Sequence, residues 1–359
     1  MLECLSLAEK GAGYVSPNPM VGAIVVKDGK IVGRGYHKRY GGPHAEISAI
    51  RQAKNSAKGG TLYVNLECCC HYGKTPPCTD AIIQSGVNRV VVGMKDPNPL
   101  VRGKGIQRLQ AANIEVELGV LRRECEKLNE VFSKFITTGQ PFVTLKVAQT
   151  LDGKIADSNG TSRWITNNQS RRIVHALRAR YDAVLVGANT ISMDDPLLTV
   201  RAIHGRNPYR VIVDGNLSSP LSSRVFLDKG KNNTFLFTSR ATARKKKNQI
   251  SKLEKSGIRV YPMSSRNGSR LDIRKILTVL AECNISSVLV EGGAKTYAEF
   301  VKANAVDKMI IFLAPKVFVD GLSPYQYLKA RKLPNALQFS RTSSWNLGGD
   351  LMIEAYLRR

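Results

Sequence analysis

The sequence lacks the features that mark secreted and membrane-spanning chains. No uninterrupted apolar run approaches the ~18 residues that a membrane-spanning helix requires. The amphipathic first residues also lack the basic start and apolar core of a signal peptide. We therefore expect a soluble, cytoplasmic protein with no membrane partner.

Cysteine is too sparse for a disulfide framework, because the chain has only seven in 359 residues. Three of them are consecutive, at Cys68, Cys69 and Cys70. In a reducing cytosol such a cluster indicates a metal site or a catalytic thiol rather than disulfide bonds.

Acidic residues are scarce, since 28 aspartates and glutamates accompany 54 lysines and arginines, and the formal net charge is +26. Such a charge is typical of proteins that bind nucleic acid. However, the excess lies mostly beyond residue 138, and only Arg240–Lys247 forms a dense run. We interpret the charge as a solvated basic surface and expect no nucleic-acid partner, with nucleic-acid binding as the alternative.

The length of the chain favours two domains. Residues 1–138 alternate between helical and strand patterns, which predicts an α/β layer sandwich. The Asp28-Gly29 pair predicts a tight hairpin turn. Strands are expected at Val21–Val26, Lys30–Tyr36, Thr61–Leu66, Arg89–Met94 and Ile114–Leu118, with helices at Leu2–Gly11, Ala45–Lys54, after Pro77, from Gly105 and at Leu121–Ile136.

Thr137–Pro141 is predicted to be a linker, so the second domain comprises residues 139–359. Its strand–helix rhythm predicts a largely parallel sheet that binds ligands beyond the carboxyl ends of the strands. Strands are expected at Phe142–Ala148, Ala183–Val186, Arg210–Val213, Thr234–Phe237, Arg259–Tyr261, Val288–Val290, Met309–Leu313 and Gly348–Leu357, with helices near Gln169–Arg180, Leu271–Glu282 and Ala294–Ala303.

The most informative motif is His44-Ala45-Glu46, which Cys69 and Cys78 follow. One imidazole and two thiolates suit a catalytic zinc site, which keeps its fourth position open for water. Glu46 would be the carboxylate that takes a proton from that water. This pattern is typical of zinc-dependent nucleobase deaminases. The competing interpretation is a surface histidine near buried structural cysteines.

Motifs in both halves resemble the bifunctional deaminase/reductase family of bacterial riboflavin biosynthesis. The first half contains Ser16–Gly22, Pro43–Glu46, Cys69–Cys78 and Asp96–Pro99, and the second contains Leu151–Ala156, Ser162–Thr166, Asp194–Pro196 and Val290–Gly293. The resemblance runs nearly end to end. It implies a cytidine-deaminase-like three-layer α/β/α domain followed by a dihydrofolate-reductase-like α/β domain.

The resemblance also implies the chemistry. The first domain would deaminate 2,5-diamino-6-ribosylamino-4(3H)-pyrimidinone 5′-phosphate with zinc, and the second would reduce the ribosyl group to ribityl with NADPH. Zinc would be bound by His44, Cys69 and Cys78, with Glu46 as the proton shuttle. The resemblance further implies a small-molecule substrate and a homo-oligomer.

Three other residues of the first domain are implied as contacts to the substrate, namely Asn18, His71 and Lys74. His71 could instead cap a turn, and Lys74 could be a solvated charge. One departure from the family is Cys68, where proline is usual. Proline would restrict the backbone, so its loss is expected to loosen the loop. The adjacent thiol could also compete for zinc or oxidise.

In the second domain, Val288–Thr296 comprises a buried strand, a glycine turn and a helix start. It is not a G-x-G-x-x-G fingerprint, but the turn could bind a phosphate through its amides. Lys146 alternates with apolar neighbours along a strand, and we expect it to assist hydride transfer. The resemblance places Ala148, Trp164, Thr190, Asp194, Gly292, Gly293, Ala294, Lys295 and Thr296 near NADPH, and Ser162, Arg178, Leu198, Arg201 and Glu291 around the substrate.

Alternatives to these assignments remain open at this point. Trp164 could fill the core, and Arg178 could be a charge on a helix surface. For the whole chain, the alternatives are a deaminase of tRNA or other nucleic acid, and a reductase whose zinc site no longer binds metal.

Overall fold

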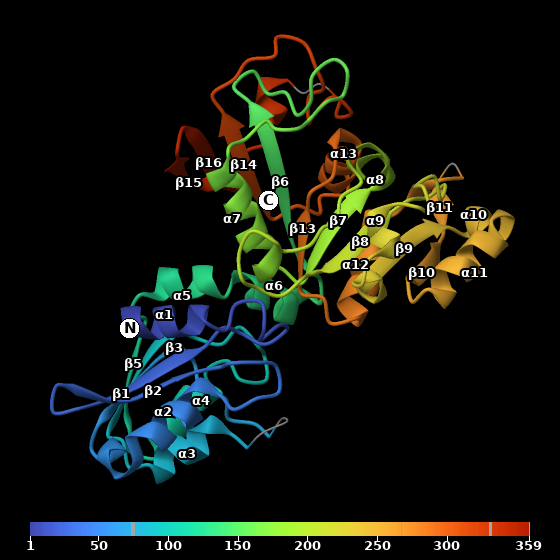
Figure 1. Ribbon diagram of the computed structural model, residues 1–359. Helices are drawn as coiled ribbons and strands as arrows, with labels where there is room; N and C mark the ends of the chain where they lie inside the picture. The colour runs from blue at the N-terminus through green and yellow to red at the C-terminus, as the bar shows by residue number, and fades with distance from the viewer. Residues whose placement is uncertain (73–75, 267, 330–331, 359) are drawn as a thin grey trace. The chain divides into compact units, whose positions relative to one another are not determined.

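The computed structural model describes residues 1–72, 76–266, 268–329 and 332–358 (Figure 1). The chain divides into two compact units, Met1–Gln140 and Pro141–Arg359, at a point inside the segment expected to be a linker. Within the described ranges, no helix is both long enough and apolar enough to cross a membrane.

The first unit is built on a five-stranded sheet with the order β2-β1-β3-β4-β5. β1 is antiparallel to both of its neighbours, whereas β3, β4 and β5 are mutually parallel. Asp28 and Gly29 both have positive φ in the β1–β2 turn, as an Asp-Gly hairpin requires. The strands are β1 (Gly22–Lys27), β2 (Lys30–Tyr36), β3 (Thr61–Leu66), β4 (Arg89–Met94) and β5 (Glu115–Leu118).

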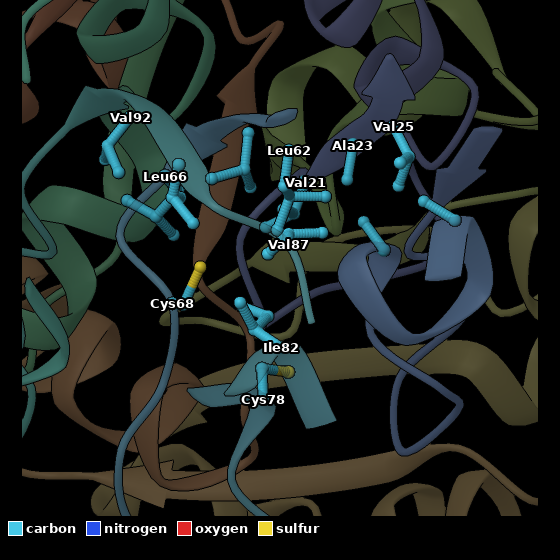
Figure 2. Packing of buried hydrophobic residues seen from close by; sticks show 14 of the residues in the cluster. Val21, Ala23, Val25, Leu62, Leu66, Cys68, Cys78, Ile82, Val87 and Val92 are labelled. Atoms are coloured by element: carbon cyan, nitrogen blue, oxygen red, sulfur yellow. The ribbon is translucent and has the colours of Figure 1, made fainter. Parts of the chain in front are cut away.

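Helices cover both faces of this sheet, which confirms the expected three-layer arrangement (Figure 1). On one face lie α1 (Leu2–Glu9) and α5 (Arg122–Leu128), and on the other lie α2 (Ala45–Ala53), α3 (Cys78–Gln84) and α4 (Lys104–Ala111). Apolar side chains of β1, β3 and β4 pack against α2 and α3 in one cluster that also contains Cys68 and Cys78 (Figure 2).

The single helix expected over Leu121–Ile136 is wrong in one respect, because it is broken into α5 and α6 (Glu130–Thr138). The break is at Asn129, whose side chain is buried. Its Oδ1 accepts the Met20 amide at 2.8 Å, and its Nδ2 donates to the Met20 carbonyl at 3.1 Å. A contact 109 residues away in the sequence therefore interrupts the helix.

The second unit contains a nine-stranded sheet with the order β10-β9-β8-β7-β13-β6-β14-β16-β15. The seven strands from β10 to β14 are mutually parallel, which confirms the expected parallel sheet. β16 is antiparallel to both of its neighbours, β14 and β15. The strands are β6 (Phe142–Thr150), β7 (Ala183–Gly187), β8 (Tyr209–Val213), β9 (Thr234–Ser239), β10 (Arg259–Met263), β13 (Ser287–Val290), β14 (Lys308–Ala314), β15 (Phe339–Leu347) and β16 (Asp350–Leu357), beside a small β11–β12 pair (Ser265–Arg266 and Arg270–Leu271).

Helices also cover both faces of this sheet, because its strands are apolar on both sides. In β13, for example, Val288 and Val290 belong to one core cluster and Leu289 to the other. The clusters show that α12 (Ile273–Glu282) and α13 (Ala294–Lys302) cover one face, and α7 (Asn168–Arg180), α8 (Ala188–Asp194), α9 (Arg224–Leu227) and α11 (Lys247–Lys255) the other, with α10 (Arg240–Lys245) just before α11.

β15 is a strand that the sequence pattern did not predict. It is an edge strand, and all of its residues except Leu347 are exposed. Its sequence, FSRTSSWNL, therefore carries no alternation of apolar and polar residues. Pairing with β16 forms this strand, rather than any local preference.

Candidate active sites

Three metal-binding side chains converge in the first unit. Among the described residues, the ligand atoms of His44, Cys69 and Cys78 all lie within 4.8 Å of one another. The His44 Nδ1 is 3.1 Å from Cys78 Sγ and 3.5 Å from Cys69 Sγ. Zinc bonds of about 2.0–2.3 Å place tetrahedral ligand atoms roughly 3.5 Å apart, so these residues fit a zinc ion.

Each of the three side chains comes from a different segment of the unit. His44 precedes α2, Cys69 follows β3, and Cys78 is the first residue of α3. The close approach of α2 to β2 depends on Gly35, because a Cβ there would lie 2.1 Å from the Ala45 carbonyl oxygen. A glycine in the neighbouring strand therefore sets where the α2 start presents its side chains.

The pKa shifts of these three side chains also favour the binding of a cation. The Cys78 side chain and amide and the His44 ring all interact with Cys69 Sγ, and they lower the pKa of Cys69 to about 4. The bond to Cys69 raises the pKa of His44 to about 9, because it stabilises the imidazolium. The pKa of Cys78 is raised, since it shares its proton with the Cys69 thiolate. A bound metal can replace the protons on His44 and Cys78.

Glu46 lies in the first turn of α2 and is only 3% exposed. Burial raises its pKa, and the nearby His44 partly opposes this shift. Glu46 is not part of the three-residue ligand cluster. The arrangement is therefore a metal site with one buried carboxyl group beside it, which can take up and release a proton.

Cys68 is not part of the ligand cluster, although it neighbours Cys69 in the sequence and its side chain interacts with Glu46. It is 1% exposed and packs in the hydrophobic core with Leu66 and Val92 (Figure 2). Burial raises the pKa of Cys68, and the nearby Glu46 and Cys69 charges add to the shift. The geometry therefore places Cys68 in the core rather than among the three grouped ligand atoms.

We expect the Cys68→Ala variant to bind about one zinc per chain, and the Cys69→Ala variant to lose most of its zinc together with deamination. The two substitutions remove the same atom from adjacent residues, which makes each the control of the other. Metal content measured by plasma mass spectrometry after gel filtration tests this expectation. Loss of zinc from Cys68→Ala would show that Cys68 is a ligand.

Asn18 lies beside this site and is oriented by a residue that the sequence analysis missed. Its Nδ2 donates to Nε2 of His37 at 3.1 Å, while Nδ1 of His37 donates to the Pro43 carbonyl at 3.0 Å. Burial lowers the pKa of His37, which keeps the ring neutral and able to accept. His37 directly follows a predicted strand, and this position was the signal that could have identified it.

Asp96 is a second residue that the site assignments missed, although it begins one of the motifs. It is 6% exposed, and burial raises its pKa to about 7, with further contributions from Glu67 and Cys69. The loop that carries it is anchored by Glu67, whose carboxylate accepts four backbone amides at 3.0–3.2 Å.

The two remaining predicted contacts of this unit lie in the loop between Cys69 and Cys78. The Nδ1 of His71 is buried without a partner among the described residues, as a group reserved for a ligand would be. Lys74 lies outside the described residues.

In the second unit, a cavity of about 1200 Å³ opens at the carboxyl ends of the parallel strands. Every residue that the sequence analysis assigned to the cofactor or substrate of this half lines it. They are Lys146, Ala148, Ser162, Trp164, Arg178, Thr190, Asp194, Leu198, Arg201, Glu291, Gly292, Gly293, Ala294, Lys295 and Thr296. Segments from residue 146 to residue 296 therefore meet in one place.

A buried ion-pair network lies at the base of this cavity. Glu291, 5% exposed at its side chain, accepts from Nε and Nη2 of Arg178 at 2.7 and 2.9 Å, and lies 3.4 Å from Nζ of Lys146. Burial alone would raise the pKa of Glu291, but Arg178 and Lys146 outweigh it and lower the pKa to about 2. Arg178 is thus a buried residue rather than a helix-surface charge.

The cavity wall also contains an exposed aromatic ring. Trp164 is 65% exposed, so it does not fill the core, and the Arg171 guanidinium lies 4.4 Å from its ring centroid. Ser162 Oγ donates to Asp194 Oδ1 at 3.3 Å. A flat ring backed by a cation offers a surface on which a heterocycle can stack.

Several residues that line the cavity were missed by the sequence analysis. They include the turn after β8 (214–216 and Ser218), the α7 residues Arg171, Arg172 and His175, and Gln326 and Tyr327 near the C-terminus. The turn after β8 could have been found, because ligands bind beyond the carboxyl ends of parallel strands. Gln326 and Tyr327 lie in a loop with no periodic pattern that could have marked them.

Both units match known protein families. Residues 1–94 match the family described as "Cytidine and deoxycytidylate deaminase zinc-binding region", and residues 141–353 match the "RibD C-terminal domain". The first match contains the metal cluster, and the second contains the residues that line the cavity.

Relatives match along the whole chain. The riboflavin biosynthesis protein RibD of Aquifex aeolicus is 47% identical over 97% of this chain and 95% of its own length. A solved deaminase/reductase of Thermotoga maritima, described as a diaminohydroxyphosphoribosylaminopyrimidine deaminase/5-amino-6-(5-phosphoribosylamino)uracil reductase, is 40% identical, with a TM-score of 0.85 over 100% of this chain and 97% of that one. The RibD structure of Acinetobacter baumannii is 34% identical, with a TM-score of 0.88 over 100% and 98%.

Proposed function

The chain belongs to the RibD family of riboflavin biosynthesis enzymes, and we propose that its two units catalyse the deamination and the reduction in sequence. The substrate of the first step is the diaminohydroxyphosphoribosylaminopyrimidine. Its product, 5-amino-6-(5-phosphoribosylamino)uracil, is the substrate of the second step. We assign residues 1–138 to the deaminase and residues 139–359 to the reductase.

In the deaminase, His44, Cys69 and Cys78 would hold zinc, which when bound would activate water for the deamination. Glu46 accepts the proton of that water and delivers protons to the ring nitrogen and to the departing ammonia. Its raised pKa suits both roles. Asn18, held by His37, and His71 contact the pyrimidine and its ribosyl phosphate, as does Lys74.

In the reductase, NADPH would supply the hydride for the ribosyl group when bound. The Gly292–Thr296 turn binds its phosphates through backbone amides. Ala148, Trp164, Thr190 and Asp194 contact the cofactor. Lys146, held by Glu291, supplies the proton that accompanies the hydride. Ser162, Leu198 and Arg201 contact the substrate, and Arg178 keeps Glu291 ionised beside it.

The observation that carries the proposal is that each unit holds one site, and each site has the groups that one of the two reactions needs. The first unit brings a zinc-ligand triad and a buried carboxyl together. This convergence argues against a reductase with a degenerate zinc site. A nucleic-acid deaminase has no use for the cavity of the second unit.

We further propose that the protein acts in the cytoplasm as a homo-oligomer without a nucleic-acid partner. The structure describes all seven cysteines, and none of them forms a disulfide bond, which suits a reducing compartment. The edge strand β15 exposes Phe339 and Trp345, which suits a contact between subunits. Light scattering during gel filtration gives the oligomeric state.

The test is mass spectrometry of the diaminohydroxyphosphoribosylaminopyrimidine incubated with purified protein, with and without NADPH. We expect an amine replaced by oxygen in both samples, and two added hydrogens only with NADPH. If the starting material is unchanged, supplying 5-amino-6-(5-phosphoribosylamino)uracil directly separates a failed deaminase from a wrong substrate assignment.

A further inference from the structure

The reductase cavity is lined by several arginines, which differ in whether a carboxylate lies beside them. Arg178 is paired with Glu291, and Arg224 lies 3.1 Å from an Asp195 carboxylate oxygen. For Arg201, the described residues provide no carboxylate partner, and its Nη1 donates to the Thr199 hydroxyl at 2.8 Å. Burial and the charges of Arg178 and Arg224 lower the pKa of Arg201. An uncompensated guanidinium in a cavity is suited to an anion.

The segment that carries Arg201 has no regular structure to hold it. Residues 195–208, between α8 and β8, contain no helix or strand. Two contacts fasten this segment to α7. Nη1 of Arg178 donates to the Thr199 carbonyl at 3.1 Å, and the amide of Arg201 donates to Nδ1 of His175 at 3.2 Å. The second contact, from the His175 ring, holds the backbone amide of Arg201 itself.

His175 is placed for this role by the helical repeat. Arg171, His175 and Arg178 are spaced by four and three residues along α7, so they share one face, and all three line the cavity. His175 accepts at Nδ1 and must be unprotonated there. Burial lowers its pKa, and the nearby Arg178 and Arg201 charges reinforce the shift, with Glu291 and the Thr199 backbone opposing it. The ring is thus kept neutral, and the contact with the Arg201 amide selects the tautomer whose proton is on Nε2.

We propose that His175 is a positioning residue for the phosphate of the reductase substrate, because it holds the Arg201 backbone so that the guanidinium faces the cavity. This inference rests on the proposed function, which assigns Arg201 to the substrate. It adds a residue that neither the motifs nor the zinc chemistry identifies.

The test compares His175→Leu with His175→Asn, whose Oδ1 can occupy the place of Nδ1 and accept the same amide. With 5-amino-6-(5-phosphoribosylamino)uracil, we expect His175→Leu to raise KM about five- to tenfold, as for the loss of one hydrogen bond, and to leave kcat within about twofold. His175→Asn should restore KM to within about twofold. With the dephosphorylated substrate, His175→Leu and the unaltered protein should have equal kcat/KM. Deaminase activity and thermal unfolding check that each variant is folded.

Two results with His175→Leu alone would overturn the proposal. One is a fall in kcat of His175→Leu at unchanged KM, and the other is an equal loss on the phosphorylated and dephosphorylated substrates. Arg201→Ala separates this inference from the proposed function. If Arg201→Ala raises KM and His175→Leu does not, the positioning role is wrong and the phosphate assignment stands. If Arg201→Ala leaves KM unchanged, the phosphate assignment fails and the inference fails with it.

Discussion

Replacing Glu46 by glutamine is expected to lower the deamination rate by about 10²–10⁴-fold, which is the usual contribution of a general acid–base residue. The amide keeps the size of the side chain in its buried position in α2, but it cannot carry the proton from water to the ring nitrogen. Because Glu46 is outside the ligand cluster, zinc should remain bound. The reductase should keep its full rate on 5-amino-6-(5-phosphoribosylamino)uracil.

The measurements are deaminase turnover and zinc content on the same preparation. Glu117→Gln provides a matched control in the same unit, because that side chain is 45% exposed and its ion-pair partner among the described residues is Arg89. It should retain normal deamination. A Glu46→Gln enzyme with more than a tenth of the normal rate would remove Glu46 from the reaction.

Replacing Glu291 by glutamine should have a large effect on both the stability and the activity of the second unit. The substitution leaves Lys146 and Arg178, which are 16% and 12% exposed, without their shared counter-charge. Breaking a buried pair in this way costs about 3–5 kcal/mol. For a unit of this size, the midpoint of thermal unfolding should fall by roughly 10 °C. Reduction should be lost, because the Lys146 ammonium is no longer held in the cavity.

Calorimetry and NADPH oxidation test this expectation. The control is Glu299→Gln, which removes the more exposed ion pairs of Glu299 with Arg270 and Lys302 in the same unit. An exposed pair contributes at most about 1 kcal/mol, so the unfolding midpoint should hardly move. Equal midpoints for the two variants would mean that the Glu291 network adds little to stability.

The same carboxylate predicts how stability changes with pH. The folded protein lowers the pKa of Glu291 from its ordinary value of 4.5 to about 2. A lowered pKa stabilises the folded state fully above pH 4.5, and this stabilisation is lost as the pH falls toward 2. It amounts to about 3 kcal/mol. Denaturant titrations at pH 5 and pH 3 should therefore show a smaller loss for Glu291→Gln than for the unaltered protein.

The sequence predicted most strands to within one or two residues, because alternation and apolar runs depend on local burial. Prediction from the sequence failed where a contact with a distant part of the chain determines the secondary structure. Asn129 ends a helix by bonding to Met20, and the polar strand β15 forms only because β16 pairs with it. In both places the local sequence pattern does not indicate the partner, which is Met20 for Asn129 and β16 for β15.

For the deaminase site, the chemical identity of the residues was sufficient for prediction. A histidine, a neighbouring carboxyl and two cysteines identify a zinc site, since few other arrangements use these groups together. The residue types of His37 and Asp96 did not by themselves identify these two residues as part of the site. Their place beside the site depends on hydrogen bonds to Asn18 and on the loop that Glu67 anchors.

The sequence by itself determined the family, the two-part organisation and the residue types that we propose for each reaction, because motifs and periodicity are properties of neighbouring residues. Only the tertiary structure decided which charges are paired. Arg178 and Glu291 lie 113 residues apart, yet they form one ion pair, whereas Arg201 has no carboxylate partner among the described side chains. Such pairing depends on which strand ends and helix faces meet, and no local pattern records it.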